Sequence, residues 1–368
     1  MEIIEIDFTN PSLIERYNQL FENCPQAFIQ QSAYWAEVIK DLGPDRPIFL
    51  LCHDAGEDVA GLPLYLYEHE IGNILTSVPQ PGPLGGIFYK AEVPKEKQEE
   101  IYQNLLHKAI EIAEHHRCMT LTLITNPFVN DIDLYVKYLQ PHFLFENFTQ
   151  YIPLSSIFQG DTIILRDYNR RSMLSRNLKK SKELNCIIKF CENSPQLQSW
   201  YAIHSQRHQE LGAVPLSYRL FENIYRLLTP KNKAQLVLVQ HNEEIVSGCV
   251  YVYHKHIMDV FMPSMNSRYA DFSVNYANID YSLYWANSLG ITHYNWQSSQ
   301  NRQCGVYNFK KQWGSLDSPY YFVTKLLCSP QKIQAIGMEN LKKHYPWHYV
   351  VPFSAFTEGF DKQLFKKS

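Results

Sequence analysis

The same series of predicted elements occurs twice in the chain, and this repeat limits the fold more than any other feature. Each half contains two helices, three consecutive strands, a helix and a further strand, in that order. Three pairs of positions align the halves at offsets of 184, 185 and 187 residues: Pro11 with Pro195, Ser32 with Ser217, and Gly61 with Gly248. Because near-constant offsets over so many elements are hard to obtain by chance, we infer an internal duplication.

Local signals mark the ends of these elements. In the first half the helices begin at Asn10-Pro11, Ser32 and Pro94, and the strands are predicted over 47–52, 59–70, 71–77 and 118–125. In the second half the helices begin at Ser194-Pro195, Ser217 and Val274, and the strands are predicted over 234–240, 245–253, 256–264 and 292–299. The predicted fold is therefore α/β (α+β), with two domains in tandem, each a mixed, mostly antiparallel sheet flanked by helices.

The length of 368 residues also favours two domains, and 45% hydrophobic residues are enough for two cores. We place the domains at 1–155 and 156–330, followed by an extension at 331–368. The net charge of -3 argues against global attraction to nucleic acid or acidic membranes, so any basic function must be local. Without a signal peptide pattern or a long apolar run, we expect a cytoplasmic protein without a transmembrane segment.

Eight scattered cysteines contain no CxxC pair, which favours buried thiols over disulfides or zinc. His115, His116 and Cys118 do not have the usual spacing of metal ligands, so no metal is expected. His254 and His256 lie near Asp259 on a predicted strand and are second choices for a base. The sequence has no Ser-His-Asp order, P-loop or dinucleotide fingerprint.

Several stretches resemble the FemAB-like acyltransferases, a group of the GNAT superfamily that includes BioF2-like proteins and the Fem-type peptidyltransferases. They are "QSAYWAEVIKDLG", "LPLYLYEHEIGNILTSVPQPGPLGG", "RRSMLSRNLKKSKELNCIIK", "HSQRHQELGAVPLS" and "GVYNFKKQWG". The last has the complete Gly-x-x-x-Phe-Lys-x-x-(Phe/Trp)-Gly spacing from Gly305 to Gly314. The resemblance covers about Gln31 to Tyr321 and implies two tandem GNAT-like domains with the active cleft in the second.

The resemblance implies that Lys310 is the catalytic residue, stabilising the oxyanion that forms when an amine attacks an acyl ester or thioester. A cation at that place can contribute about 3 to 4 kcal/mol. Phe309 and Trp313 would flank the lysine and exclude water. The alternative is a surface turn with solvated lysines.

Other residues are expected to bind substrate. Arg207 matches an arginine that contacts the acceptor in Fem-type enzymes, and Tyr307, Tyr253 and Asp259 are further candidates. A basic run predicts a phosphate site, made of Arg170, Arg171, Arg176, Lys179 and Lys180. The alternative for this run is a solvated helix that links the domains.

The resemblance implies no tightly bound cofactor and a donor substrate that is aminoacyl-tRNA, an acyl-carrier protein or acyl-CoA. The segment "PSMNSRYADFSVNY" has no glycine where a CoA pyrophosphate loop would lie, which disfavours conventional CoA binding. The segment between Asn169 and Asn185 has no long helical arm of the kind found in some Fem-type enzymes, which counts against tRNA as the donor as well.

The predicted function is transfer of an acyl or aminoacyl group to an amine, with a peptidoglycan precursor as a possible acceptor. Two alternatives remain. One is a CoA- or carrier-protein-dependent N-acyltransferase that acts on a small amine or amino sugar. The other is a non-catalytic GNAT-fold module that binds a nucleotide sugar or RNA.

Overall fold

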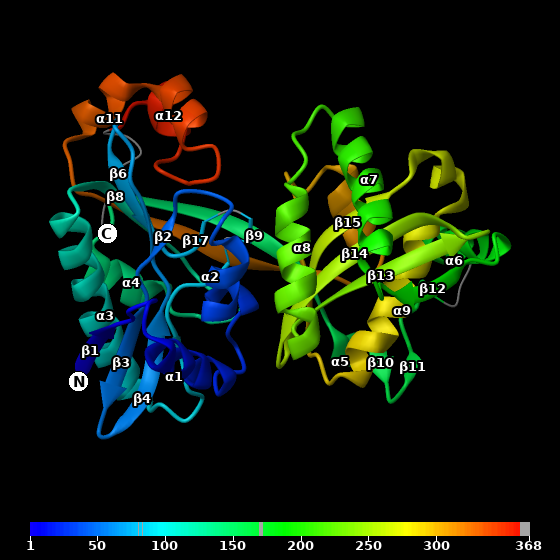
Figure 1. The fold of residues 1–368 in the computed structure, drawn as a ribbon, viewed down its shortest axis with the longest axis horizontal. Helices are drawn as coiled ribbons and strands as arrows, with labels where there is room; N and C mark the ends of the chain where they lie inside the picture. The colour runs from blue at the N-terminus through cyan, green and yellow to red at the C-terminus, as the bar shows by residue number, and fades with distance from the viewer. Residues whose placement is uncertain (80, 83, 169–171, 361–368) are drawn as a thin grey trace. The chain divides into compact units, whose positions relative to one another are not determined.

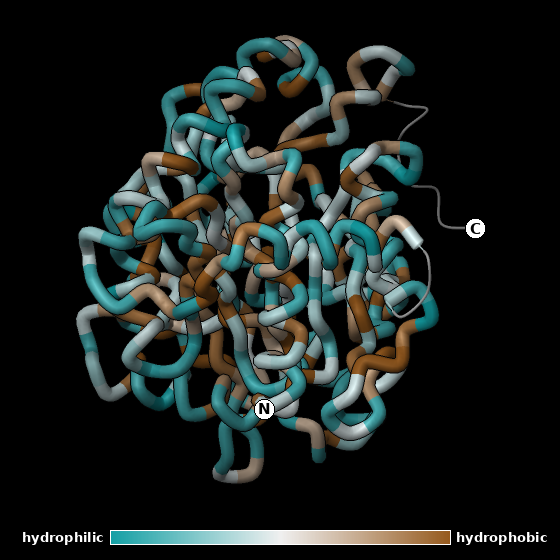
Figure 2. Tube along the Cα trace, turned by 90° about the vertical axis from the view of Figure 1, so that its right-hand side faces the viewer, coloured by the Kyte–Doolittle hydropathy of each residue, from teal (hydrophilic) through white to brown (hydrophobic). Residues whose placement is uncertain are grey.

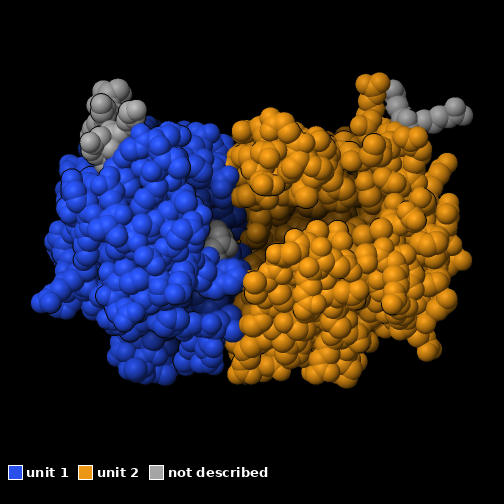
Figure 3. All heavy atoms as spheres, turned by 90° about the horizontal axis from the view of Figure 1, so that it is seen from above, with its two compact units in different colours: residues 1–147, 319–368 blue, residues 148–318 orange. Residues whose placement is uncertain are grey.

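The computed structural model describes residues 1–79, 81–82, 84–168 and 172–360, and it divides into two compact units (Figures 1 and 3). Unit 1 consists of Met1–Asn147 and Pro319–Ser368, and unit 2 of Phe148–Ser318. These limits differ from the predicted boundaries at 155 and 330, because strands β9 (Phe143–Pro153) and β17 (Leu316–Leu326) each run from one unit into the other.

Unit 1 begins as the sequence predicts. Helix α1 (Pro11–Glu22) is capped by Asn10, whose side chain accepts hydrogen bonds from the amides of Ser12 and Leu13. The Ser32 hydroxyl caps α2 (Ala33–Ile39) through the amide of Trp35, and Pro94 precedes the long helix α3 (Lys95–His115). Also in this half are η1 (Ile29–Gln31) and α4 (Ile132–Leu139).

The strands of unit 1 form two sheets. One has the order β1-β3-β4-β7. The other contains β17, β8, β6, β5 and β2, with β6 parallel to β8. The bounds are β1 (Glu2–Glu5), β2 (Arg46–Pro47), β3 (Leu50–Asp54), β4 (Glu57–Leu62), β5 (Tyr65–Tyr67), β6 (Asn73–Thr76), β7 (Phe88–Tyr89) and β8 (Cys118–Ile124).

The predicted strand over 59–70 is wrong as a single element. Strand β4 ends at Leu62 and β5 begins at Tyr65 in the other sheet, with Pro63 between them. A proline has no amide proton to donate to a sheet, so it is suited to the point where the chain leaves one sheet for another. The expected three-stranded meander of this half is therefore divided between two sheets.

The C-terminal extension packs on unit 1. Its helices are α11 (Pro330–Ile336), α12 (Met338–His344) and α13 (Ser354–Glu358). Ile333, Leu341 and Val351 share an apolar cluster with Met119 and Phe143. The Tyr345 hydroxyl donates a hydrogen bond to the carbonyl of Gly72 at 2.6 Å.

Unit 2 matches the predicted order closely. Its strands pair as β12-β13-β14-β15-β16-β9, antiparallel except for β15 and β16. The strand bounds are β12 (Ile187–Phe190), β13 (Ala234–His241), β14 (Glu244–His254), β15 (Ile257–Met265) and β16 (His293–Ser298), with a small hairpin of β10 (Phe158–Gln159) and β11 (Thr162–Ile163). The helices are α5 (Leu154–Ile157), α6 (Met173–Glu183), α7 (Ser194–Glu210), α8 (Tyr218–Leu227), η2 (Thr229–Lys231), η3 (Ser267–Phe272), α9 (Val274–Ser288) and α10 (Gly305–Lys311).

Alternating residues of β14 show how this sheet is covered. A side chain at Gly248 would meet Trp200 of α7 within 3 Å, so this face carries α7. The next residue, Cys249, belongs to the core cluster that contains Ile279 and Leu283 of α9. Helices therefore cover both faces of the sheet. Along the Cα trace, hydrophobic segments lie towards the interior and hydrophilic segments towards the outside (Figure 2). Within the described residues, no helix has the length and the apolar character to cross a membrane.

Candidate functional site

A split between the two parallel strands of unit 2 opens a cavity. Strand β15 continues to Met265, but its pairing with β16 stops at Asp259, opposite Asn295. Beyond this point a cavity of about 440 Å³ opens. It is lined by Gly248, Cys249, Val260, Phe261, Pro263, Asn275, Asn278, Ile279, Trp296, Gln297, Ser298, Gly305, Val306, Phe309 and Lys310.

Two β-bulges shape the walls of this cavity. The register of β14 with β15 shifts at Phe261, and the register of β16 with β9 shifts at Trp296. Both residues line the cavity, as expected for bulges that redirect side chains near functional sites. Gln297, next to the second bulge, has a φ of +61°, which is uncommon for a residue other than glycine.

Lys310 lies near the end of α10, a short helix rather than the surface turn of the alternative interpretation. Its side chain is buried, with 5% exposed. The ammonium donates hydrogen bonds to the carbonyl oxygens of Gln297 at 3.0 Å and Ser298 at 2.8 Å. The strained turn after the bulge thus supplies the two acceptors that hold the lysine at the cavity.

Burial changes the acidity of this lysine. In the described part of the chain Lys310 has no ion pair with a carboxylate, and burial lowers its pKa to about 8, an effect that the nearby Cys304 thiol partly opposes. A lysine with this pKa is still mostly protonated at neutral pH. An ammonium has three donors, so two carbonyls leave one N–H for a ligand.

The structure brings together only some of the predicted site residues. Phe309 lines the cavity beside Lys310. Trp313 is fully buried behind Phe309, with ring centres 6.4 Å apart. Tyr307 faces Asp317 instead, its hydroxyl donating at 3.3 Å.

The remaining predicted substrate-binding residues do not line the cavity. Tyr253 packs on Trp285, and burial raises its pKa to about 12. Asp259 is buried where the strand pairing ends and accepts a hydrogen bond from Asn295 at 2.6 Å. Arg207 lies near the end of α7 and forms an ion pair with Glu210 at 3.1 Å.

The basic run forms helix α6, with Arg176, Lys179 and Lys180 exposed. Leu174, Leu178 and Ser181 form its buried face. Arg170 and Arg171 lie outside the described residues. The helix packs next to the start of α9, where the Ser273 hydroxyl donates to the side-chain oxygen of Asn177 at 3.2 Å.

Sequence reasoning missed the wall formed by α9. Asn275 and Asn278 line the cavity three residues apart on a mostly apolar helix. That spacing places both amides on one face, which is a signal that could have been found. The bulge residues Phe261 and Trp296 carried no comparable signal.

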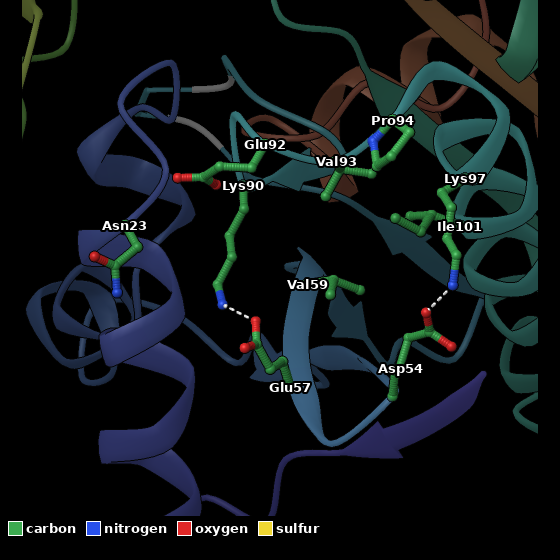
Figure 4. A pocket seen from close by; sticks show the side chains of 11 residues that line it. Asn23, Asp54, Glu57, Val59, Lys90, Glu92, Val93, Pro94, Lys97 and Ile101 are labelled. Atoms are coloured by element: carbon green, nitrogen blue, oxygen red, sulfur yellow. Dashed lines mark hydrogen bonds and ion pairs between the residues drawn. The ribbon is translucent and has the colours of Figure 1, made fainter.

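Unit 1 has a cavity of about 630 Å³ with different chemistry (Figure 4). Its lysines are paired: Lys90 contacts Glu57 at 3.1 Å, and Lys97 forms an ion pair with Asp54. Val59, Val93 and Ile101 lie between the two pairs. Since each lysine already has a carboxylate partner, this cavity is a poorer place for a negative charge to develop than the one at Lys310.

Comparisons with known proteins agree with this geometry. Residues 168–311 match the family described as the acetyltransferase (GNAT) domain. This range contains the described cavity, including Lys310. GNAT acyltransferases use acyl-CoA as a donor substrate rather than a tightly bound cofactor. A comparison with proteins of curated function found no match.

Three solved structures share the fold over most of the chain. FemX has a TM-score of 0.69 at 14% identity, covering 92% of this chain and 100% of FemX. The C-terminal domain of a putative lysylphosphatidylglycerol synthetase from Agrobacterium fabrum has a TM-score of 0.56 at 11% identity, covering 89% and 96%. A conserved protein of unknown function from Bacteroides thetaiotaomicron has a TM-score of 0.51 at 10% identity, covering 88% and 99%.

The predicted fold class is confirmed, because FemX is similar in structure to nearly the whole of this chain. Low identity restricts that similarity to the fold, whereas the family match concerns the segment that builds the cavity. Residues 168–311 therefore match the acetyltransferase (GNAT) domain, and the chain has a two-unit fold similar to that of FemX.

Proposed function

We propose that unit 2 transfers an acyl group from a thioester donor to an amine acceptor, with Lys310 stabilising the oxyanion. The amine nitrogen attacks the donor carbonyl carbon, and the oxygen becomes negatively charged in the tetrahedral intermediate. The C–S bond then breaks, the thiolate leaves, and the proton lost by the amine balances the thiolate. The Fem-type resemblance favours an amine of a cell-wall precursor as acceptor.

The observation that carries this proposal is the buried ammonium of Lys310. Two of its protons are held by the carbonyls of Gln297 and Ser298, which fixes its position before any ligand binds. A donor fixed in advance, in a site that excludes water, stabilises a developing negative charge more than a mobile donor does. The Lys310 side chain is buried, which indicates that the site can exclude water.

The split of the strands supports a thioester on an extended amide-containing arm. Beyond Asp259 the edge of β15 is no longer paired with β16, so backbone groups there can hydrogen-bond to amides of the donor. Such an arm is common to CoA and to carrier proteins.

Helix α6 supports a phosphate-containing donor. Its exposed residues Arg176, Lys179 and Lys180 flank Asn177, which accepts a hydrogen bond from Ser273 at the start of α9. Asn275 of α9 lines the cavity. We propose that these cations bind phosphate groups of the donor, together with Arg170 and Arg171. They would replace the glycine loop that the sequence lacks.

The test compares Lys310→Met with Lys311→Met in transfer from pentanoyl-CoA to methoxyamine, measured by thiol release with the spontaneous reaction subtracted. Lys311 is the matched control because it is exposed and its ammonium contacts the carbonyl of Ser315 at 3.0 Å. Lys310→Met should lower kcat by about 10² to 10³, and Lys311→Met should leave it nearly unchanged. Equal rates in the two variants, or no wild-type transfer above background, would refute the proposal.

The pH dependence gives a second test of the role of Lys310. Methoxyamine is deprotonated throughout the range, so the acceptor does not add its own titration. If protonated Lys310 stabilises the oxyanion, kcat should fall as the pH rises through about 8. A rate that increases through the same pH would assign Lys310 the role of a base instead.

A further inference from the structure

The charges around the cavity restrict the acyl group that unit 2 can accept, provided that the proposed function holds. None of the described residues that line it is aspartate or glutamate. Lys310 is the only basic residue among the described residues of the lining, and burial raises the pKa of the Cys249 thiol, which stays neutral. At neutral pH the described lining therefore has one positive charge and no negative charge.

Four groups at the cavity that could accept hydrogen bonds from an ammonium are already occupied. The carbonyls of Gln297 and Ser298 accept from Lys310. The side-chain oxygen of Asn278 accepts from the Tyr251 hydroxyl at 2.7 Å, and that of Asn275 accepts from the Ser247 hydroxyl at 2.6 Å. A second ammonium in the cavity would thus meet a like charge, with no carboxylate in the described lining to compensate it.

The other walls are apolar and continuous with the core. Cys249, Val260, Ile279 and Trp296 line the cavity and belong to the main hydrophobic cluster of unit 2, and Phe309 packs against it. An acetyl group has only one methyl to place against such a surface. A chain of several carbons would remove more apolar area from water, and each buried methylene adds to binding.

We propose that the cavity takes an apolar acyl chain longer than acetyl and excludes aminoacyl groups. The carbonyl carbon of the donor lies at Lys310, and the chain extends along Val260, Ile279 and Trp296. Of the donors that the sequence analysis left as alternatives, this chemistry of the cavity favours an acyl thioester over aminoacyl-tRNA.

The experiment measures binding and initial rates of N-methoxyamide formation from methoxyamine for three donors: pentanoyl-CoA, 4-aminobutyryl-CoA and acetyl-CoA. The amide product is followed because the amine of 4-aminobutyryl-CoA also releases thiol by attacking its own thioester. The first two acyl chains are nearly equal in size and differ only at the end, where 4-aminobutyryl has an ammonium in place of the terminal methyl of pentanoyl. We expect pentanoyl-CoA to exceed 4-aminobutyryl-CoA by about 10- to 100-fold in kcat/KM, because of the unpaired ammonium. It should also exceed acetyl-CoA by about tenfold or more, because of the additional methylenes.

A designed carboxylate provides the matched variant. Asn275→Asp keeps an acceptor for the Ser247 hydroxyl and adds a negative charge to the lining. It should reduce the preference for pentanoyl-CoA over 4-aminobutyryl-CoA by at least about fivefold. Asn287→Asp introduces the same charge at a partly exposed position of α9 that does not line the cavity, and it should leave the preference unchanged.

The outcomes separate this inference from the function on which it rests. Turnover with 4-aminobutyryl-CoA or acetyl-CoA equal to or better than pentanoyl-CoA would overturn the inference and leave acyl transfer intact. If none of the three thioesters is bound or turned over, the proposed function is overturned, and the inference with it.

Discussion

Replacing Asp131 with Asn should remove a pH-dependent loss of stability from unit 1. Asp131 is 5% exposed and precedes α4. The Tyr102 hydroxyl donates a hydrogen bond to its Oδ2, while Oδ1 has no hydrogen-bond partner among the described residues. Burial raises the pKa of this carboxyl from 3.8 to about 7, because little compensates the charged form.

The direction of the effect follows from proton binding. Between pH 3.8 and 7 the folded protein keeps a proton that the unfolded chain has lost, so the free energy of unfolding falls as the pH rises. A difference of about three units corresponds to about 4 kcal/mol in total. About 3 kcal/mol of this should be lost between pH 5 and pH 8.

Urea unfolding of wild type and Asp131→Asn at pH 5 and pH 8 tests the prediction. The amide of the variant will lack a partner and can cost about 1 to 3 kcal/mol, but this cost does not depend on pH. The measured quantity is therefore the change in the difference between the two proteins, which should favour the variant by about 3 kcal/mol more at pH 8 than at pH 5.

Asp133→Asn is the matched control, because Asp133 is an exposed carboxyl on the same turn. Its difference from wild type should be the same at both pH values. If Asp131→Asn also gave a constant difference, the carboxyl would be ionised in the folded protein, and the argument from burial would be refuted.

Two further predictions concern unit 2. Burial, and to a smaller extent the neighbouring His208, lowers the pKa of His204 from 6.5 to about 4. Wild type should therefore lose about 3 kcal/mol of stability as the pH falls through this range. In urea unfolding, His204→Phe should abolish this pH dependence, and a pH dependence unchanged from wild type would contradict the assignment. Gln150, which accepts from the Ser299 hydroxyl at 2.6 Å and donates to the carbonyl of Tyr307 in α10 at 3.2 Å, positions the helix that carries Lys310. Gln150→Leu should lower kcat by about tenfold and shift the pH at which the rate falls, whereas a change in stability alone would make Gln150 purely structural.

The sequence predicted most of the framework, because its signals lie within a few residues of the element they control. The side chains of Asn10 and Ser32 cap the helices that follow them, as expected from N-cap preferences. The strands of unit 2 are short apolar runs bounded by turn residues, so each was predicted from its own segment. Where the prediction failed, at Pro63, the competing factor was the choice of sheet, which depends on distant partners.

The resemblance of the segment from Gly305 to Gly314 to the Fem-type motif indicated Lys310, and the basic run that forms α6 indicated either a phosphate site or a solvated helix. Only the tertiary structure decided that Lys310 is buried at a cavity. The two bulges depend on the pairing of β14 with β15 and of β16 with β9, and the acceptors for the ammonium depend on the turn at Gln297. Register and burial are set by contacts between segments far apart in the chain, so no local pattern can specify them.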